Sequence, residues 1–279
     1  MKVTYLGTTM LLFDDGKDQI LFDCHVTRPS IPVFALGKLK TDEAVADKVI
    51  RQFKMNRLKA MFISHSHHDH VMDAPYFANV CGCDIYGTKS TMNVAKGGNV
   101  AEEKIHLFSD GDKIQLGDYN ITVMASLHSK PSFFNNDLGQ VIEEPLVQPM
   151  KKKAYKEGGS YDFLVEHKGR KYLIRPSYNF IPGQLDGVQA DVLFLAIAGL
   201  AKDEKGHKEQ FWKETVEKVK PELVIPLHWD NFFTPLYSPI IGLPKMFEFT
   251  GKSMHDLAAA CAERGVCCAV QMPLTTMEI

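Results

Sequence analysis

A short apolar run at residues 58–63 passes directly into a segment that holds four histidines within six residues. The segment reads Ser64-His65-Ser66-His67-His68-Asp69-His70. A bounded apolar run of this length predicts a buried strand, and α/β proteins place their functional sites beyond the ends of such strands. Alternate residues of an extended segment point the same way, so His65 and His67 can converge on one point. A turn into a helix would aim Asp69 and His70 at a neighbouring point.

Imidazole nitrogens and carboxylates are ligands that zinc and similar transition metals accept. We therefore interpret the segment as a metal-binding loop rather than as a histidine-rich surface loop. Two further histidines follow predicted strands in the same way: His128 comes after residues 119–125 and His228 directly after residues 223–227. Either one alone is more typical of a structural histidine. Behind this loop, they are candidate ligands for a two-metal site.

The rest of the chain alternates between short apolar or alternating runs and segments with helical spacing, which predicts an α/β fold. No repeat or linker composition divides it, so we expect a single domain over residues 1–279. Residues 129–160 carry few periodic positions and are expected to form a loop or lid insertion. Further strands are expected at 2–6, 10–13, 19–22, 84–87, 113–116, 119–125, 161–167, 171–175, 192–197, 223–227 and 266–271, and helices at 41–54, 74–80, 89–96, 209–219 and 253–265.

The composition argues against several classes of protein. Lys+Arg 32 against Asp+Glu 34 gives a formal net charge of -2, which offers no general field for nucleic acid. No stretch reaches the roughly 18 consecutive apolar residues of a membrane span, and the opening residues lack a signal-peptide pattern. We expect a cytoplasmic protein whose six cysteines are free thiols.

The pattern His65-x-His67-x-Asp69-His70, with a later His128 and a final His228, resembles the metallo-β-lactamase superfamily. Within it, the chain looks most similar to small bacterial metal-dependent hydrolases that include L-ascorbate 6-phosphate lactonase. The resemblance implies a four-layer αββα sandwich with the metals at one edge of two sheets. It assigns ligands residue by residue: His65, His67 and His128 to a first metal, and Asp69, His70 and His228 to a second.

One position departs from the superfamily pattern. A bridging aspartate usually follows the strand expected at 171–175, and Ser177 stands there in this chain. Two divalent ions bring a charge of about +4, and Asp69 with one hydroxide offsets only about half of it. Either the second metal binds weakly or a substrate anion completes the site. Arg175 would contact that anion or form a structural salt bridge, and Asp230 is a candidate to support a ligand from behind.

These residues predict a hydrolase in which a metal-bound hydroxide attacks a small anionic substrate, a lactone or an ester. Asp69 would bind metal and orient the nucleophile. One or two zinc ions are the expected cofactor, with manganese or iron as alternatives. A phosphodiesterase for a nucleotide or phospholipid headgroup, and a non-catalytic metal-binding or ligand-sensing protein, remain alternative functions. The oxygen-reducing diiron branch fits less well, because it prefers a glutamate where His67 stands. The expected partner is a small molecule rather than nucleic acid, and the sequence leaves open whether the chain forms a homo-oligomer.

Overall fold

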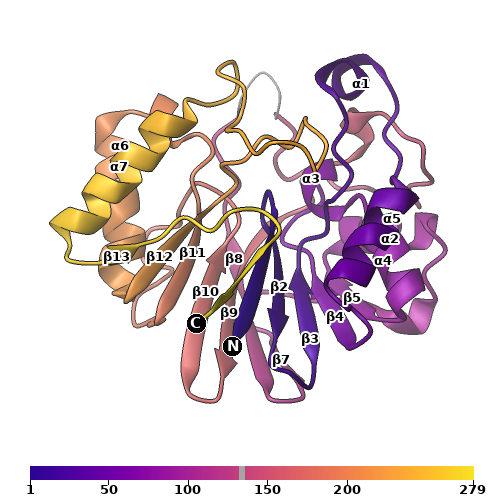
Figure 1. The fold of residues 1–279 in the computed structure, drawn as a ribbon, viewed down its shortest axis with the longest axis horizontal. Coiled ribbons are helices and arrows are strands. Elements are labelled where there is room, and N and C mark those ends of the chain that lie inside the picture. Colours follow the sequence, from indigo (N-terminus) through magenta and orange to yellow (C-terminus); the bar gives the residue numbers. More distant parts are fainter. Residues whose placement is uncertain (132–135) are drawn as a thin grey trace.

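Two twisted sheets pack face to face in the computed structural model, which describes residues 1–131 and 136–279 (Figure 1). Within these residues each sheet has seven strands. The first sheet has the order β14 (Thr275–Glu278), β1 (Lys2–Gly7), β2 (Met10–Asp14), β3 (Gln19–Phe22), β4 (Leu58–Phe62), β5 (Asp84–Gly87) and β6 (Ile105–Leu107). The second has the order β13 (Cys267–Cys268), β12 (Leu223–Leu227), β11 (Val192–Ala196), β10 (Arg170–Arg175), β9 (Ser160–His167), β8 (Tyr119–Ser126) and β7 (Lys113–Leu116).

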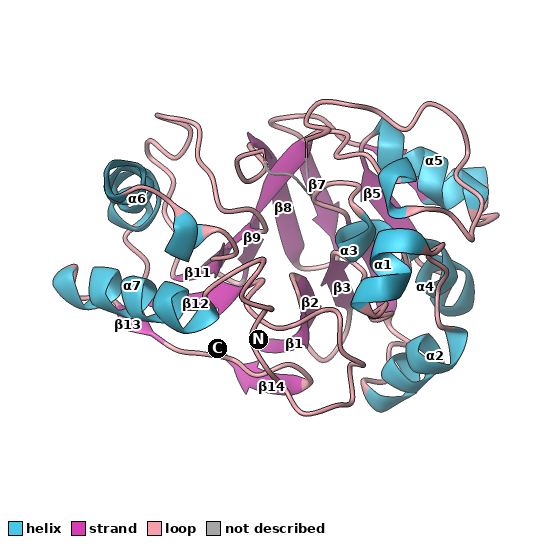
Figure 2. Ribbon diagram, turned by 90° about the horizontal axis from the view of Figure 1, so that it is seen from above, coloured by secondary structure: helices cyan, strands magenta, loops and turns pink. Residues whose placement is uncertain are grey.

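Helices cover the outer face of each sheet, which confirms the expected αββα sandwich (Figure 2). None of the described helices is long and apolar enough to cross a membrane. The first sheet carries α1 (Ile31–Leu36), α2 (Glu43–Gln52), α3 (His68–Val71), α4 (Ala74–Cys81) and α5 (Lys89–Gly97), and the second carries α6 (Lys205–Trp212) and α7 (Thr250–Glu263). Short single turns are η1 (Glu102–Lys104), η2 (Lys152–Ala154), η3 (Leu200–Lys202) and the π-helical turn η4 (Lys213–Glu217).

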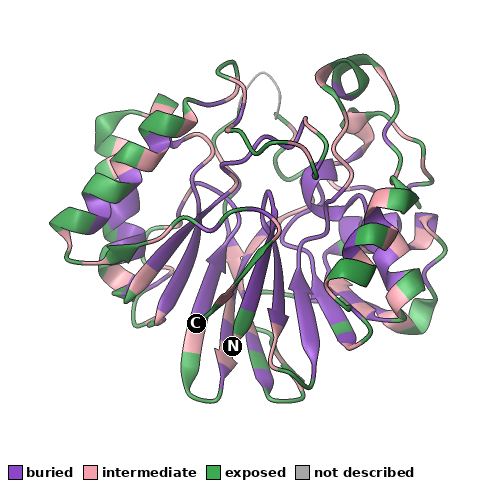
Figure 3. Ribbon diagram, viewed as in Figure 1, coloured by how far each residue is buried: buried purple, intermediate pink, exposed green. Residues whose placement is uncertain are grey.

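Aromatic side chains fill the space between the two sheets. Phe13 on β2 packs edge-on against Tyr172 of β10 and Phe194 of β11, with ring centroids 5.4 and 5.9 Å away. Phe22 on β3 lies 5.3 Å from Phe163 of β9. Rings at these separations add favourable edge interactions to the apolar area that they bury. Both sheets are therefore held by one continuous core, visible as the buried strands of Figure 3.

Strand direction brings the functional loops to one edge of the sandwich. β3, β4, β5 and β6 run parallel, as do β10, β11 and β12. β8 is antiparallel to β9, which is antiparallel to β10, so β8 runs in the same direction as β10. The carboxyl ends of parallel strands meet at one edge, where open α/β sheets bind ligands.

The structure corrects several predicted boundaries. The helix expected at 209–219 starts at Lys205 and changes to a π-helical turn at Lys213. The last helix begins at Thr250 rather than at 253, so Ser253 lies inside it, where its hydroxyl accepts a hydrogen bond from the backbone of Ala201. The strand expected at 266–271 is reduced to β13, since past Cys268 the chain leaves that sheet and returns as β14 beside β1.

The predicted insertion at 129–160 packs against the helical side of the first sheet. Ile142, Leu146 and Tyr155 are buried there, and η2 is its short helical turn. Residues 132–135 of the insertion lie outside the described residues. All six cysteines are free thiols in the structure, as expected.

Candidate metal centre

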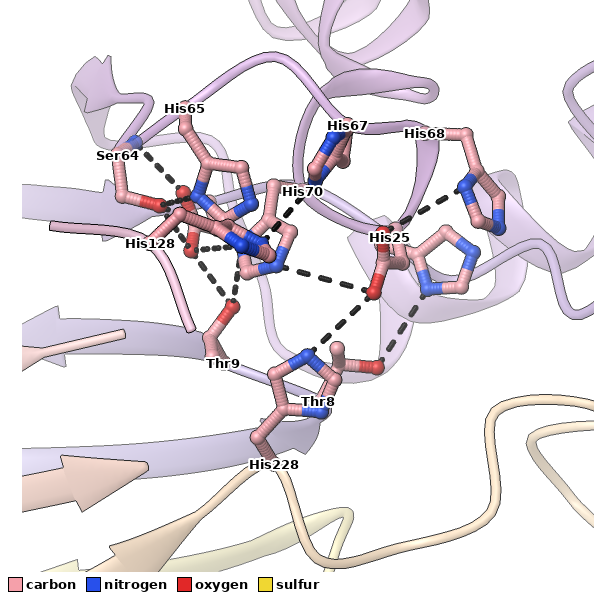
Figure 4. Close-up of polar contacts among 12 residues, drawn as sticks. Thr8, Thr9, His25, Ser64, His65, His67, His68, His70, His128 and His228 are labelled. Atoms are coloured by element: carbon pink, nitrogen blue, oxygen red, sulfur yellow. Dashed lines mark hydrogen bonds and ion pairs between the residues drawn. The ribbon is translucent and has the colours of Figure 1, made fainter. Parts of the chain in front are cut away.

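Six metal-ligating side chains meet at the edge where strands of both sheets end (Figure 4). Four come from the loop after β4 and from α3, one from the segment after β8, and one from the residue after β12. They form two triads, and within each triad the ligand atoms lie within 4.8 Å of one another. The first triad is His65, His67 and His128, and the second is Asp69, His70 and His228. The structure thus brings together all six residues that the sequence nominated.

The first triad consists of buried imidazoles that face one another. Nδ1 of His67 lies 3.2 Å from Nε2 of His128. The other nitrogens are occupied from outside: His128 Nδ1 donates to the carbonyl of Ser129 at 3.0 Å, and His67 Nε2 donates to Asp137 Oδ1 at 3.1 Å. Nε2 of His65 is buried and has no hydrogen-bond partner among the described residues. The inward nitrogens are therefore free to accept a cation.

The second triad surrounds one carboxylate. Asp69 Oδ2 lies 3.7 Å from Nε2 of His70 and 3.4 Å from Nε2 of His228. The two triads are adjacent, because the rings of His65 and His70 have centroids 3.8 Å apart. Burial alone would raise the pKa of Asp69, but the charges of His70 and His68 and contact with His228 outweigh it and hold the pKa well below its usual range. Asp69 is thus a carboxylate at neutral pH.

Burial keeps His65 and His128 of the first triad neutral. It lowers the pKa of His65 well below the ordinary histidine value and lowers the pKa of His128 to about 3, with neighbouring histidines adding to the effect. A metal binds the unprotonated imidazole, so these ligands need lose no proton near pH 7.

Asp23, which the sequence analysis did not nominate, supports this loop from behind. One carboxylate oxygen accepts from Thr9 at 2.6 Å and from His70 Nδ1 at 2.8 Å, and the other accepts from the backbone of Ser64 at 2.8 Å. The hydrogen bond from His70 Nδ1 to Asp23 fixes the ring of His70 with its Nε2 toward Asp69. The signal was present in the sequence, because Asp23 directly follows the strand 19–22 and so lies at the same edge.

Asp230 supports His228 in a similar way but through the backbone. It is fully buried and accepts hydrogen bonds from the hydroxyl of Tyr5 at 2.5 Å, the backbone of Thr8 at 2.8 Å and Arg28 at 2.7 Å. The backbone of His228 donates to the carbonyl of Thr8 at 2.6 Å and has a positive φ of 58°. Asp230 therefore anchors the chain that presents His228 and does not touch a ligand side chain.

A cavity of about 460 Å³ opens over both triads and includes Ser177 in its wall. Ser177 is buried two residues beyond β10, on the side of the second sheet. Arg175 is not part of this wall. Its guanidinium is fully buried, lies 3.2 Å from Asp162 and donates to the carbonyl of Asn179 at 3.0 Å. Of the two roles considered for Arg175, the geometry supports the structural salt bridge.

The donor set fits a pair of divalent transition metals. Three imidazoles form the first triad, and two imidazoles with one carboxylate form the second, which are the nitrogen and oxygen donors that zinc prefers. A buried imidazole nitrogen without a partner, as in His65, is costly in a folded protein unless a ligand satisfies it.

Known proteins resemble this chain in sequence and in fold. The model of the beta-lactamase superfamily domain matches residues 19–229. A metal-dependent hydrolase of Carboxydothermus hydrogenoformans is 24% identical over 234 residues, which cover 83% of this chain and 86% of that protein. Among solved structures, the metallo hydrolase Igni18 of Ignicoccus hospitalis is 16% identical with a TM-score of 0.58 and covers 100% of this chain and 98% of its own. The metallo-beta-lactamase fold protein YhfI of Bacillus subtilis is 15% identical with a TM-score of 0.60 and covers 99% of both chains. These two structures share the fold.

Proposed function

This chain belongs to the β-lactamase superfamily and is a metal-dependent hydrolase, and from that premise we propose that it hydrolyses an ester or lactone bond in a small anionic molecule. The observation that carries the proposal is the pair of triads at the floor of one cavity of about 460 Å³. A cavity of this size suits a small molecule. His65, His67 and His128 would hold one metal, and Asp69, His70 and His228 the other.

The chain's own residues have distinct tasks in this proposal. Bound metal would supply a hydroxide near neutral pH and polarise the bond under attack. Asp69 is the catalytic residue: Oδ2, which stands between His70 and His228, accepts a hydrogen bond from the attacking water and orients it. The outward bonds of His67, His70 and His128 hold their rings in place, so little reorganisation is needed when substrate enters.

Charge supports an anionic substrate. Two divalent ions bring about +4, and Asp69 is the one acidic ligand in the two triads. Ser177 contributes a neutral hydroxyl to the cavity wall where a carboxylate would lower the positive charge. Zinc is the metal we propose, because all six donors are imidazole nitrogen or carboxylate oxygen.

The decisive experiment joins metal analysis to an activity screen. Protein purified without chelator is examined by inductively coupled plasma mass spectrometry and assayed on lactones, carboxylic esters, thioesters and phosphodiesters. We expect about two zinc ions for each chain and turnover of anionic esters or lactones. Turnover of phosphodiesters alone would favour the phosphodiesterase alternative. A single metal with no turnover in any class, together with tight binding of a metabolite, would favour a sensor.

A further inference from the structure

A second cavity of about 400 Å³ adjoins the metal centre on the side of His67. His67 lines both cavities, and so do Met246 and Phe247 at their shared rim. The remaining wall comes from α1, from His68, and from residues 136–137 and 152–156 of the insertion at 129–160. Because the two cavities share these lining residues, a substrate that reaches over His67 would occupy both.

The two cavities differ in charge. Among the described residues, the second is lined by three lysines, Lys152, Lys153 and Lys156, and by a single carboxylate, that of Asp137. That carboxylate is already engaged by His67 at 3.1 Å. Within the described residues neither Lys153 nor Lys156 has an ion-pair partner within 4.0 Å, although the charge of Lys156 helps to lower the pKa of Asp137. We call this space the lysine pocket.

The lysines of the main cavity are engaged by neighbouring groups. Lys130 lies 2.9 Å from Asp203, and Lys202 donates to the carbonyl of Met246 at 2.7 Å. The main cavity also contains the carboxylates of Asp203 and Glu248. Excess positive charge from side chains is thus concentrated in the lysine pocket.

His68 gives independent evidence that the pocket receives a ligand. Its side chain is buried at 7% exposure, and its Nε2 has no hydrogen-bond partner among the described residues. Its other nitrogen lies 3.5 Å from Asp69 Oδ1. A buried polar atom without a partner destabilises the fold unless a ligand satisfies it, and His68 lines the lysine pocket but not the main cavity.

The pocket also has an apolar side. The ring of Phe34 on α1 packs against His68 with centroids 5.2 Å apart, and Nζ of Lys152 stands 4.6 Å from the centre of the same ring. Ile31 and Met246 extend this apolar wall toward the rim shared with the metal centre. A short aliphatic segment fits between the metals and the lysines.

We propose that the lysine pocket binds an acidic group of the substrate, a carboxylate or a phosphate, that an aliphatic spacer separates from the bond being cleaved. Lys153 and Lys156 supply the charge, and His68, in the tautomer that carries its proton on Nε2, donates a hydrogen bond to the acidic group. The proposal deepens the proposed function and rests on it, because it names the substrate class of the same site. Lys153, Lys156 and His68 determine specificity and take no part in bond cleavage, whereas His67 belongs to the first triad.

The test uses a pair of esters that differ only at the remote end. The mono-4-nitrophenyl ester of glutaric acid carries a carboxylate where 4-nitrophenyl pentanoate carries a methyl group, and the 4-nitrophenyl ester of 3-phosphonopropanoic acid supplies the phosphate-like case. For the Lys153→Gln/Lys156→Gln protein we expect KM for the anionic esters to rise about tenfold, as two partly screened charge contacts would give. KM for the neutral ester and kcat for all three should stay within about twofold. The anionic ester with the larger change in KM shows whether the pocket prefers a carboxylate or a phosphate.

Lys151→Gln is the matched control, since Lys151 is an exposed lysine of the same run that does not line the pocket. It should leave all KM values unchanged. An equal change for neutral and anionic esters, or an equal effect of Lys151→Gln, would overturn the proposal while leaving the hydrolase intact.

A binding measurement separates failure of the pocket from failure of the proposed function. Titration calorimetry of glutarate into metal-loaded wild type, double variant and Lys151→Gln requires no turnover. If none of the esters is hydrolysed, the proposed function fails. The pocket still stands if glutarate binds about tenfold more weakly to the double variant alone, and it falls if all three proteins bind glutarate alike.

Discussion

The ligand histidines owe their readiness for metal to their burial. Because burial lowers the pKa of His65 and His128, these two imidazoles are neutral at pH 7 and do not repel a cation. The outer bond from His128 to the Ser129 carbonyl fixes which nitrogen faces inward. Each ligand is thus set by its own surroundings, which makes single substitutions informative.

Replacing one ligand should remove metal without unfolding the chain. For His65→Ala or His67→Ala we expect loss of metal from the first triad and loss of hydrolysis, because three imidazoles are needed there and two leave an incomplete set. The side chains lie beyond a strand end, so the aromatic core between the sheets stays intact. Metal stoichiometry by mass spectrometry and circular dichroism check this. Activity retained with an emptied site, or a globally unfolded variant, would contradict it.

Ser177 should govern how tightly the second metal binds. Ser177→Asp adds a carboxylate to the wall of the cavity that holds both triads, so occupancy of the second site should rise. The added negative charge should also weaken inhibition by inorganic phosphate, by about tenfold as a first estimate. Metal titration and phosphate inhibition curves of wild type and variant decide the matter. Equal metal affinity and equal inhibition would mean that Ser177 does not act on the metals.

Asp23 should matter for metal affinity although it is not a ligand. Asp23→Asn weakens the acceptor that orients His70, so affinity at the second triad should fall about 10–100-fold. Asp73→Asn is the matched control, because Asp73 is an equally buried carboxylate that accepts from the backbone of Val26 and Thr27 and touches no ligand. Competitive metal titration with a chelating dye measures both. If Asp23→Asn and Asp73→Asn lose metal affinity equally, Asp23 acts only by stabilising the fold and not by orienting His70.

Among the secondary-structure elements, the strands that are buried on both faces were predicted from the sequence. A strand that forms only because a neighbouring strand offers it an edge was missed. β4, β11 and β12 are apolar along nearly their whole length, and that pattern was visible. β14 is mostly exposed and exists because β1 offers it an antiparallel edge, so nothing local marks it. The same reasoning holds for the site. Ligands at strand ends were predictable, but the pairing of Arg175 with Asp162 depends on how two strands lie together.

The turn between β1 and β2 contacts the chain that presents His228. Gly7, the last residue of β1, leads into this turn. Gly7 has a φ of +101°, and a Cβ there would lie 1.9 Å from Nη2 of Arg28. Gly7→Ala should therefore displace Arg28 from Asp230 and release the chain that presents His228. We expect a loss of about 2–4 kcal/mol in the free energy of unfolding and reduced occupancy of the second metal.

Gly16→Ala controls for backbone strain alone. Gly16 has a similar φ of +91°, but its added Cβ would meet no atom within 4 Å. Its cost should be about 1 kcal/mol, with both metals retained. Urea unfolding and metal analysis compare the two variants. If both alanine variants lose the same free energy of unfolding and both keep two metals, the predicted clash with Arg28 affects neither stability nor metal binding.

For the whole molecule, the metal centre is a junction between the two sheets. Each triad takes ligands from the β4–α3 region of the first sheet and one histidine from the second, His128 or His228. Bound metal therefore links the two sheets at this edge. Because a metal that binds only the folded state stabilises it in proportion to its saturation, loading should raise the unfolding temperature of the entire sandwich in one transition.

The buried histidines also make the metal-free protein sensitive to acid. Burial lowers the pKa of His25 and His65 well below the ordinary value, of His68 to about 4 and of His128 to about 3, whereas the unfolded chain keeps values near 6.5. Below about pH 6.5 the unfolded state therefore binds more protons, and stability falls as the pH falls toward these lowered values. Each such histidine contributes up to about 1.4 kcal/mol for each pH unit.

Urea unfolding of chelator-treated protein should accordingly show a midpoint that is steady above pH 7 and declines steeply between about pH 6 and pH 4.5. His25→Gln removes one of the buried histidines without removing a ligand of either triad. The free energy of unfolding of this variant should therefore fall less steeply with decreasing pH, because up to one proton fewer is taken up on unfolding. With metal present, the midpoint at pH 7 should be higher, and acid should erase the difference because protonated imidazole cannot bind metal. A midpoint that does not change over this range, or an identical slope for His25→Gln, would show that these histidines reach solvent in the metal-free state.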